Sequence, residues 1–207
     1  MQALFEKVHI DNNKSIQISE ISEPFFPSPW HFHPEIEIMY VKQSAGTRIV
    51  GNNLNSFREG DLVIVGSGLP HVWRNDDLYY QSSQCLLSKA IVIKFRKDFL
   101  GENFFQLPEM KKINRFLERS QFGIWFKGEE KREMIDIIKM MPQKDGVEAI
   151  VDLIVLLNKM SITENIEILS KNFTLMDKDL GDNERMDKII SFILEKFKSG
   201  IKLCEVA

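Results

Sequence analysis

The sequence predicts an α+β protein, and three features lead to this prediction. Between about residues 14 and 99, short runs rich in β-branched and aromatic residues alternate with turn-forming residues, which is typical of antiparallel β-structure. After residue 99 the spacing of apolar residues changes from two to about 3.6, the period of an α-helix. Hydrophobic residues make up 43% and charged residues 28% of the 207 positions, a composition that supports a sizeable core.

Five runs in the first half have the pattern of β-strands. Residues 15–19 alternate polar and apolar side chains, and four further runs are short and rich in β-branched or aromatic residues: 35–41, 47–50, 61–65 and 89–95. Turn-forming residues separate these runs, and this spacing is typical of a sandwich or a small barrel. Pro24, Pro27 and Pro29 cannot donate hydrogen bonds to a sheet ladder, so we expect a loop or a sheet edge there.

Three of the four histidines lie in two stretches that alternate as strands do. His31, His33 and Glu37 are separated by even numbers of residues and therefore share one face of an extended segment. His71 can reach them from a neighbouring strand. Three imidazoles and one carboxylate suit a divalent ion such as zinc, nickel, iron or manganese. The alternative is a polar interior in which the histidines bond one another or an organic ligand. Glu35 has the same parity as Glu37, so strand geometry alone does not choose between them.

These residues resemble the two-part signature of the cupin barrel. The first part is His31-x-His33-x-x-x-Glu37. The second part runs from Gly60 through Gly68 and His71 to Asn75, with Gly66 where the signature has proline. The resemblance implies a double-stranded β-helix, or jelly roll, over residues 1–100.

Aromatic and cationic residues near the motif are candidates for contact with a small molecule. Trp30 and Trp73 each lie beside a motif histidine, and aromatic walls next to polar groups suit a sugar or another small organic ligand. Ordinary core packing would explain the same tryptophans. The full set of candidate ligand-binding residues is Trp30, His31, His33, Glu35, Glu37, Tyr40, Arg48, His71 and Trp73.

Helical periodicity predicts three helices after the barrel. The first begins near Pro108 and continues through Leu117, the second covers residues 129–141, and the third covers 145–160. Apolar residues leave little polar surface on the third helix, which therefore needs cover on more than one side. The stripe on this helix can pack against the barrel or pair with a second subunit, and as a candidate dimer interface it consists of Val147, Ile150, Val151, Ile154 and Leu157.

The end of the chain resembles the start of the DNA-binding domain of AraC-family transcription regulators. Residues 185–195 have the pattern of that domain's first helix, and Leu203, Val206 and Ala207 fit the segment that opens its first helix-turn-helix. The resemblance implies a barrel at 1–100, a helical dimerisation and coupling segment at 101–160, a linker at 161–183, and a truncated DNA-binding domain at 184–207. Residues 182–205 hold five basic and five acidic side chains, a balance that offers no face for tracking phosphates.

Composition excludes several other classes of protein. The net charge is −3, no basic block is present, and no run approaches the roughly 18 apolar residues of a membrane span. The two cysteines, Cys85 and Cys204, lie far apart, so a disulfide framework is not expected. We therefore expect a cytoplasmic protein. The resemblance to AraC-family regulators implies a homodimer that is not an enzyme, binds a small effector such as a sugar, and contacts DNA only through the missing domain. The alternative is a metal-dependent cupin enzyme, an isomerase or a dioxygenase.

Overall fold

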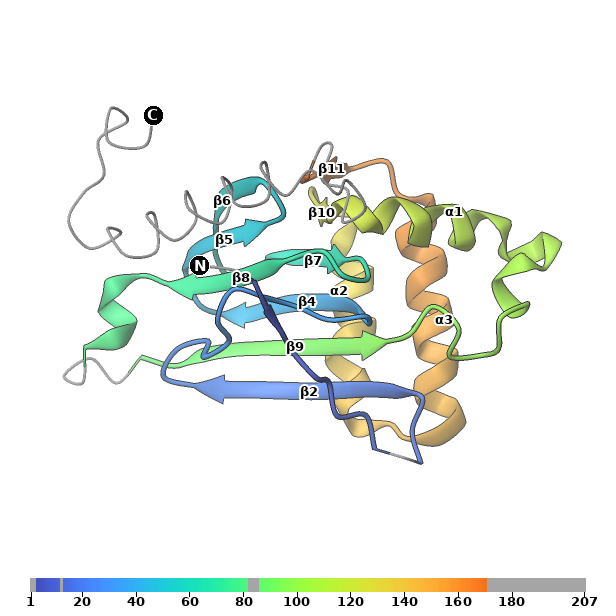
Figure 1. Ribbon diagram of the computed structural model, residues 1–207, viewed down its shortest axis with the longest axis horizontal. Coiled ribbons are helices and arrows are strands. Elements are labelled where there is room, and N and C mark those ends of the chain that lie inside the picture. The colour runs from blue at the N-terminus through green and yellow to red at the C-terminus, as the bar shows by residue number, and fades with distance from the viewer. Residues whose placement is uncertain (1–2, 12, 82–85, 171–207) are drawn as a thin grey trace.

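Two antiparallel β-sheets face each other and form a barrel in the computed structural model, which describes residues 3–11, 13–81 and 86–170 (Figure 1). The larger sheet has the order β11 (Ile166–Ile168), β10 (Ile124–Phe126), β7 (Leu62–Val65), β4 (Ile36–Gln43), β9 (Ser88–Phe95) and β2 (Ile16–Glu23). The smaller sheet has the order β1 (Leu4–Phe5), β3 (His31–Phe32), β8 (His71–Asn75), β5 (Gly46–Val50) and β6 (Asn53–Phe57). Only the short pairing of β1 with β3 is parallel among these described strands.

Strand β4 is buried on both faces, and its alternation separates two cores. Ile36, Ile38 and Tyr40 belong to a core shared with the helices. Met39 and Val41, one residue out of phase, belong to the core inside the barrel. Because side chains alternate along a strand, β4 lies between the barrel interior and the helical layer.

Three helices cover the outer face of the larger sheet: α1 (Lys111–Arg119), α2 (Lys131–Met140) and α3 (Gly146–Ile162) (Figure 1). Short 3₁₀ helices occur at Asp77–Tyr80, Phe104–Gln106, Pro108–Met110, Ser120–Phe122 and Met141–Gln143. The buried side of α3 consists of Ala149, Leu153, Leu156, Leu157 and Met160. Among the described residues, no helix is long and apolar enough to span a membrane.

The strands and helices predicted from periodicity are present. Each predicted β-run coincides with a strand of the barrel, and the three predicted helices correspond to α1, α2 and α3. The proline-rich stretch before β3 is a loop, as expected. The structure also differs from the expected segments, because β10 and β11 join the larger sheet although they lie beyond residue 100. The predicted linker thus contributes a strand up to Ile168, whereas the predicted helix pattern at 185–195 and the tail lie outside the described residues.

Gly66, which stands where the cupin signature has proline, makes a contact that a proline could not make. Its backbone N–H donates to the carbonyl of Ser120 over 2.8 Å. A Cβ atom at this position would lie 2.5 Å from the Cα of Gln121. The short helix that follows α1 therefore packs directly on the backbone at the end of β7, and this packing requires both the N–H and the absence of a side chain.

Candidate functional site

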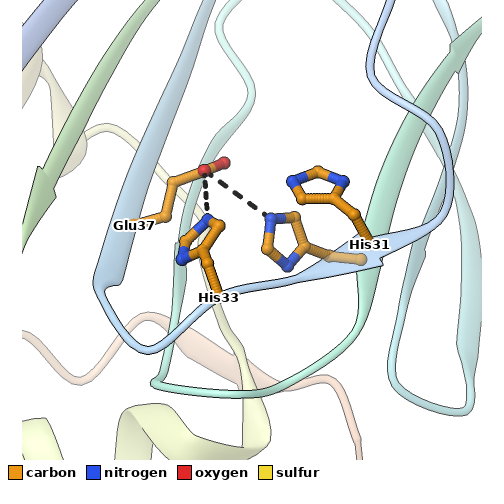
Figure 2. A group of neighbouring side chains, drawn as sticks. His31, His33 and Glu37 are labelled. Atoms are coloured by element: carbon orange, nitrogen blue, oxygen red, sulfur yellow. Dashed lines mark hydrogen bonds and ion pairs between the residues drawn. The ribbon is translucent and has the colours of Figure 1, made fainter. Parts of the chain in front are cut away.

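His31, His33, Glu37 and His71 meet inside the barrel. His31 on β3 lies directly opposite His71 on β8, and Glu37 comes from β4 of the facing sheet. All four are buried, and one ligand atom from each lies within 4.8 Å of the others. Figure 2 shows the labelled His31, His33 and Glu37 converging on one point. The predicted convergence of the two histidine stretches is therefore present.

Backbone carbonyls fix the hydrogen on each histidine ring. The Nδ1 atoms of His31, His33 and His71 donate to the carbonyls of Pro29, Glu35 and Leu69, over 2.7, 3.1 and 2.8 Å. A carbonyl can only accept, so each Nδ1 carries a hydrogen, and a neutral ring of His31 or His71 then presents a lone pair at Nε2. Nε2 of His33 is instead hydrogen-bonded to the Glu37 carboxylate over 3.1 Å. The buried Nε2 atoms of His31 and His71 have no hydrogen-bond partner among the described residues. Such orientation of imidazoles by carbonyls is typical of metal-binding histidines.

Glu37 supplies negative charge to the same point. Its Oε2 lies 3.1 Å from Nε2 of His33 (Figure 2). The same oxygen lies 3.6 Å from Nε2 of His71. The ammonium of Lys94 lies 3.3 Å from the same oxygen. Burial would raise the pKa of Glu37, but His71, His33 and Lys94 outweigh burial and hold this pKa well below its usual range. Glu37 is therefore a buried carboxylate at neutral pH.

His31 is neutral at neutral pH. Burial and the neighbouring His71 lower its pKa to about 4, although the Pro29 carbonyl and the carboxylates of Glu37 and Glu6 act in the opposite direction. A neutral ring with its hydrogen on Nδ1 is the form that binds a cation through Nε2.

The donor set fits a divalent cation. Three imidazole nitrogens and one carboxylate oxygen are ligands that first-row transition metals prefer, and four protein ligands leave positions for water or an added molecule. Unpartnered lone pairs and a carboxylate directed at one point in a buried space also need a positive charge nearby. An ion held there would act as a Lewis acid toward an oxygen or anionic group of a bound molecule.

A cavity of about 170 Å³ opens beside this cluster. Its lining includes His31, Glu37 and Lys94 of the cluster. Its apolar lining residues include Ile21, Phe26, Met39, Trp73 and Val92. Apolar side chains together with a few polar groups are the usual composition of a site for a small organic molecule.

Of the other predicted ligand-binding residues, some face the barrel interior and others do not. Trp73 lines the cavity. Arg48 is fully buried and lies directly opposite Trp73 in the pairing of β5 with β8, so both side chains face the barrel interior. Glu35 precedes β4, and its carbonyl accepts the His33 hydrogen bond, whereas its carboxylate is not in the four-residue group.

Tyr40 and Trp30 lie away from the cavity, contrary to the expectation for both. Tyr40 is on the helix-facing side of β4, where the ammonium of Lys139 lies 6.0 Å from its ring centroid. Trp30 packs with Ile49 and Val72 in a separate small core. Side chains alternate between the two faces of a strand, and Tyr40 is an odd number of residues, three, from Glu37, so it lies on the opposite face. Trp30 directly precedes His31 and for the same reason points away from the barrel interior.

Sequence reasoning missed two charged residues at the site. Lys94 lies directly opposite Glu37 in the pairing of β9 with β4. Glu6 follows β1, and its Oε2 lies 2.9 Å from Nε2 of His31 and 3.2 Å from Nζ of Lys94. The alternation in residues 89–95 puts Lys94 on the same face as Ala90 and Val92, but only the strand pairing reveals that this face is the barrel interior.

No protein-family model matches the sequence, and no curated protein matches it. A cupin 2 conserved barrel domain protein from Salinispora arenicola CNS-205 is similar in structure with a TM-score of 0.34 and 19% identity, over 42% of this chain and 69% of that one. ToxT from Vibrio cholerae, an AraC-family regulator, has a TM-score of 0.42 and 9% identity, over 93% of this chain and 70% of that one. ToxT from strain SCE256 with a bound unsaturated fatty acid has a TM-score of 0.41 and 10% identity, over 96% and 69% of the two chains.

The barrel is of the cupin type. Two antiparallel sheets face each other, and the two histidine stretches meet between them. The predicted α+β class with an N-terminal cupin-type barrel is thus confirmed.

Proposed function

We propose that the chain is the effector-sensing and dimerisation part of a cytoplasmic AraC-type transcription regulator. The observation that carries the proposal is the cavity beside the four-residue cluster, which is lined by both charged and apolar side chains. The small effector occupies this cavity. The resemblance of the tail to an AraC-type DNA-binding domain supplies the regulatory half of the proposal.

Strand β4 provides a route from the effector to the helices. Glu37 and Met39 line the cavity, whereas Ile36, Ile38 and Tyr40 pack in the core shared with the helices. An effector that favours one position of β4 also favours one packing of the helical layer. The ligand must bind the two arrangements with different affinities, because otherwise it shifts no population.

The exposed side of α3 is the proposed contact with a second copy. Val147, Val151 and Val155 recur every four residues along the helix and are 74%, 50% and 42% exposed. Ile150 and Ile154 beside them are half-buried. Leu157, which belonged to the predicted interface, is instead fully buried in the core, because α3 turns that side toward the sheet. A self-complementary apolar stripe on one helix suits a two-fold dimer.

A metabolite screen tests the sensing role. We expect at least one small metabolite to raise the melting temperature of the 207-residue chain. Its affinity, measured by calorimetry, should fall in Trp73→Ala, which changes the cavity wall, and remain unchanged in Tyr40→Phe, on the other face of β4. Binding that is indifferent to Trp73, or absent for every metabolite tested, would contradict the proposal. Regulation itself is tested in a longer chain that includes a C-terminal DNA-binding domain, in which the effector should change promoter binding.

The four-donor cluster also supports a second candidate, a metal-dependent cupin enzyme such as an isomerase or a dioxygenase. In that case the residues of the cluster would hold the ion, and Trp73 and Met39 would bound the substrate. Stoichiometric iron or manganese in the purified protein, together with turnover that is lost in His33→Ala, would favour the enzyme over the sensor.

A further inference from the structure

Glu6 reaches the histidine cluster from the N-terminal strand. Strand β1 pairs with β3 so that Leu4 lies opposite His31 and Phe5 opposite Phe32. Two backbone hydrogen bonds extend this pairing, from Leu4 N to Trp30 O over 3.0 Å and from Glu6 N to Phe32 O over 2.9 Å. The backbone of Glu6 is therefore tied to the strand that carries His31.

The contact between Glu6 and His31 joins two acceptors. His31 donates its Nδ1 hydrogen to Pro29, so in the neutral ring Nε2 carries a lone pair, and Oε2 of Glu6 lies 2.9 Å from this nitrogen. Two acceptors at this distance repel each other unless a positive charge lies beside both. Oε2 of Glu37 lies farther, 3.6 Å, from the Nε2 atom of His71.

Lys94 supplies part of this positive charge. Its ammonium lies 3.2 Å from Oε2 of Glu6 and 3.3 Å from Oε2 of Glu37, so it joins the two carboxylates. A cation at the centre of the histidines would share these carboxylates with Lys94. With both carboxylates, the donor set becomes three nitrogens and two oxygens, which suits an ion that accepts more than four ligands, such as Ni²⁺ or Mn²⁺.

We propose that Glu6 is a fifth protein ligand of a divalent cation held by His31, His33, Glu37 and His71, and that Lys94 competes with this cation for the two carboxylates. This inference rests on the barrel site of the proposed function and adds the N-terminal strand to it. Because Glu6 is attached to β1, binding of the cation stabilises the pairing of β1 with β3.

Nickel titration of the chelator-treated 207-residue chain tests the ligand assignment. We expect Glu6→Gln to weaken Ni²⁺ binding about tenfold or more in calorimetry, as loss of a ligand or its support does. Lys94→Met should tighten binding, because it removes a cation from both carboxylates. Glu20→Gln is the matched control, since Glu20 is also an exposed carboxylate paired with a lysine, Lys42, over 3.0 Å, and should leave the affinity unchanged.

Two further readouts separate ligation from a general electrostatic effect. Cobalt absorbs visible light more strongly with four ligands than with five or six, so Glu6→Gln should intensify the spectrum of the Co²⁺-loaded protein. Nickel should also slow hydrogen exchange at the amides of Leu4 and Glu6 in the unmodified chain and not in Glu6→Gln.

An affinity and a cobalt spectrum that are both unchanged in Glu6→Gln would overturn the inference and leave the four-residue site standing. Failure of the unmodified chain to bind Ni²⁺, Mn²⁺ or Co²⁺ would also overturn it. Neither result affects the proposed sensing role, which is decided by metabolite binding at Trp73.

Discussion

Arg48 on β5 forms an ion pair with Asp61, the residue that precedes β7, and so joins the two sheets through the barrel interior. The Arg48 side chain is fully buried, and that of Asp61 is 5% exposed. The guanidinium of Arg48 also lies 5.2 Å from the ring centroid of Trp125. Burial raises the pKa of Asp61, although Arg48 acts to lower it. The pair therefore exists at the cost of removing both charges from water.

Removal of one partner of this pair should be strongly destabilising. We expect Arg48→Met and Asp61→Asn each to lower the free energy of unfolding by about 3–5 kcal/mol, because the remaining group is left buried without its partner. The double variant Arg48→Met/Asp61→Leu should lose less free energy of unfolding than the two single variants lose together. Urea denaturation measures all three, with Asp98→Asn in the exposed Arg96 pair as the control. Losses no larger than in that control would contradict the prediction.

Restoring the proline of the cupin signature at position 66 should lower the stability of this protein. Gly66→Pro removes the hydrogen bond to Ser120 and places a ring against the backbone of Gln121. Overpacking of this kind costs about 1–3 kcal/mol, to which the lost hydrogen bond adds. The measurement is the melting temperature and urea stability relative to Ser67→Ala, a change at the exposed neighbour. A variant as stable as the parent chain would show that the short helix moves away without cost.

Asn75 should control both stability and the cavity wall. Its side chain accepts the backbone N–H of Phe26 over 2.8 Å and donates to the hydroxyls of Ser44 and Ser88. Asn75→Ala leaves the Phe26 N–H without an acceptor, at a cost of about 1–3 kcal/mol. Phe26 lines the cavity, so effector affinity should also fall. Asn55→Ala, at a partly buried asparagine of β6, is the control variant. Equal effects of the two variants on stability and effector affinity would contradict this role of Asn75.

Dimerisation should depend on the exposed side of α3. We expect the chain to elute as a dimer and Val151→Asp to convert it to a monomer, because a carboxylate at the centre of an apolar contact is desolvated without a partner. Size-exclusion chromatography with light scattering gives the mass. Leu54→Asp, at an exposed apolar residue of β6, should leave the dimer intact. A chain that is monomeric at all concentrations would exclude this interface.

Local patterns identified the elements well because each depends on residues close together in sequence. The β-branched and aromatic content of 35–41 and 89–95 predicted β4 and β9, and the 3.6 period predicted α2 and α3. The short strands β10 and β11 were not predicted. Each has only three residues, and their place in the larger sheet depends on pairing between Ile124 and Ile168, which are far apart in the chain.

The sequence by itself determined five of the strands, the three helices and which four donors share a site, because periodicity, parity within a strand and the spacing of the motif are local properties. Only the tertiary structure decided that Glu6 reaches His31 and that Lys94 reaches Glu37. Tertiary packing also decided which side of α3 is buried. These outcomes depend on strand register and on the packing of segments distant in sequence, and no pattern within one segment specifies them.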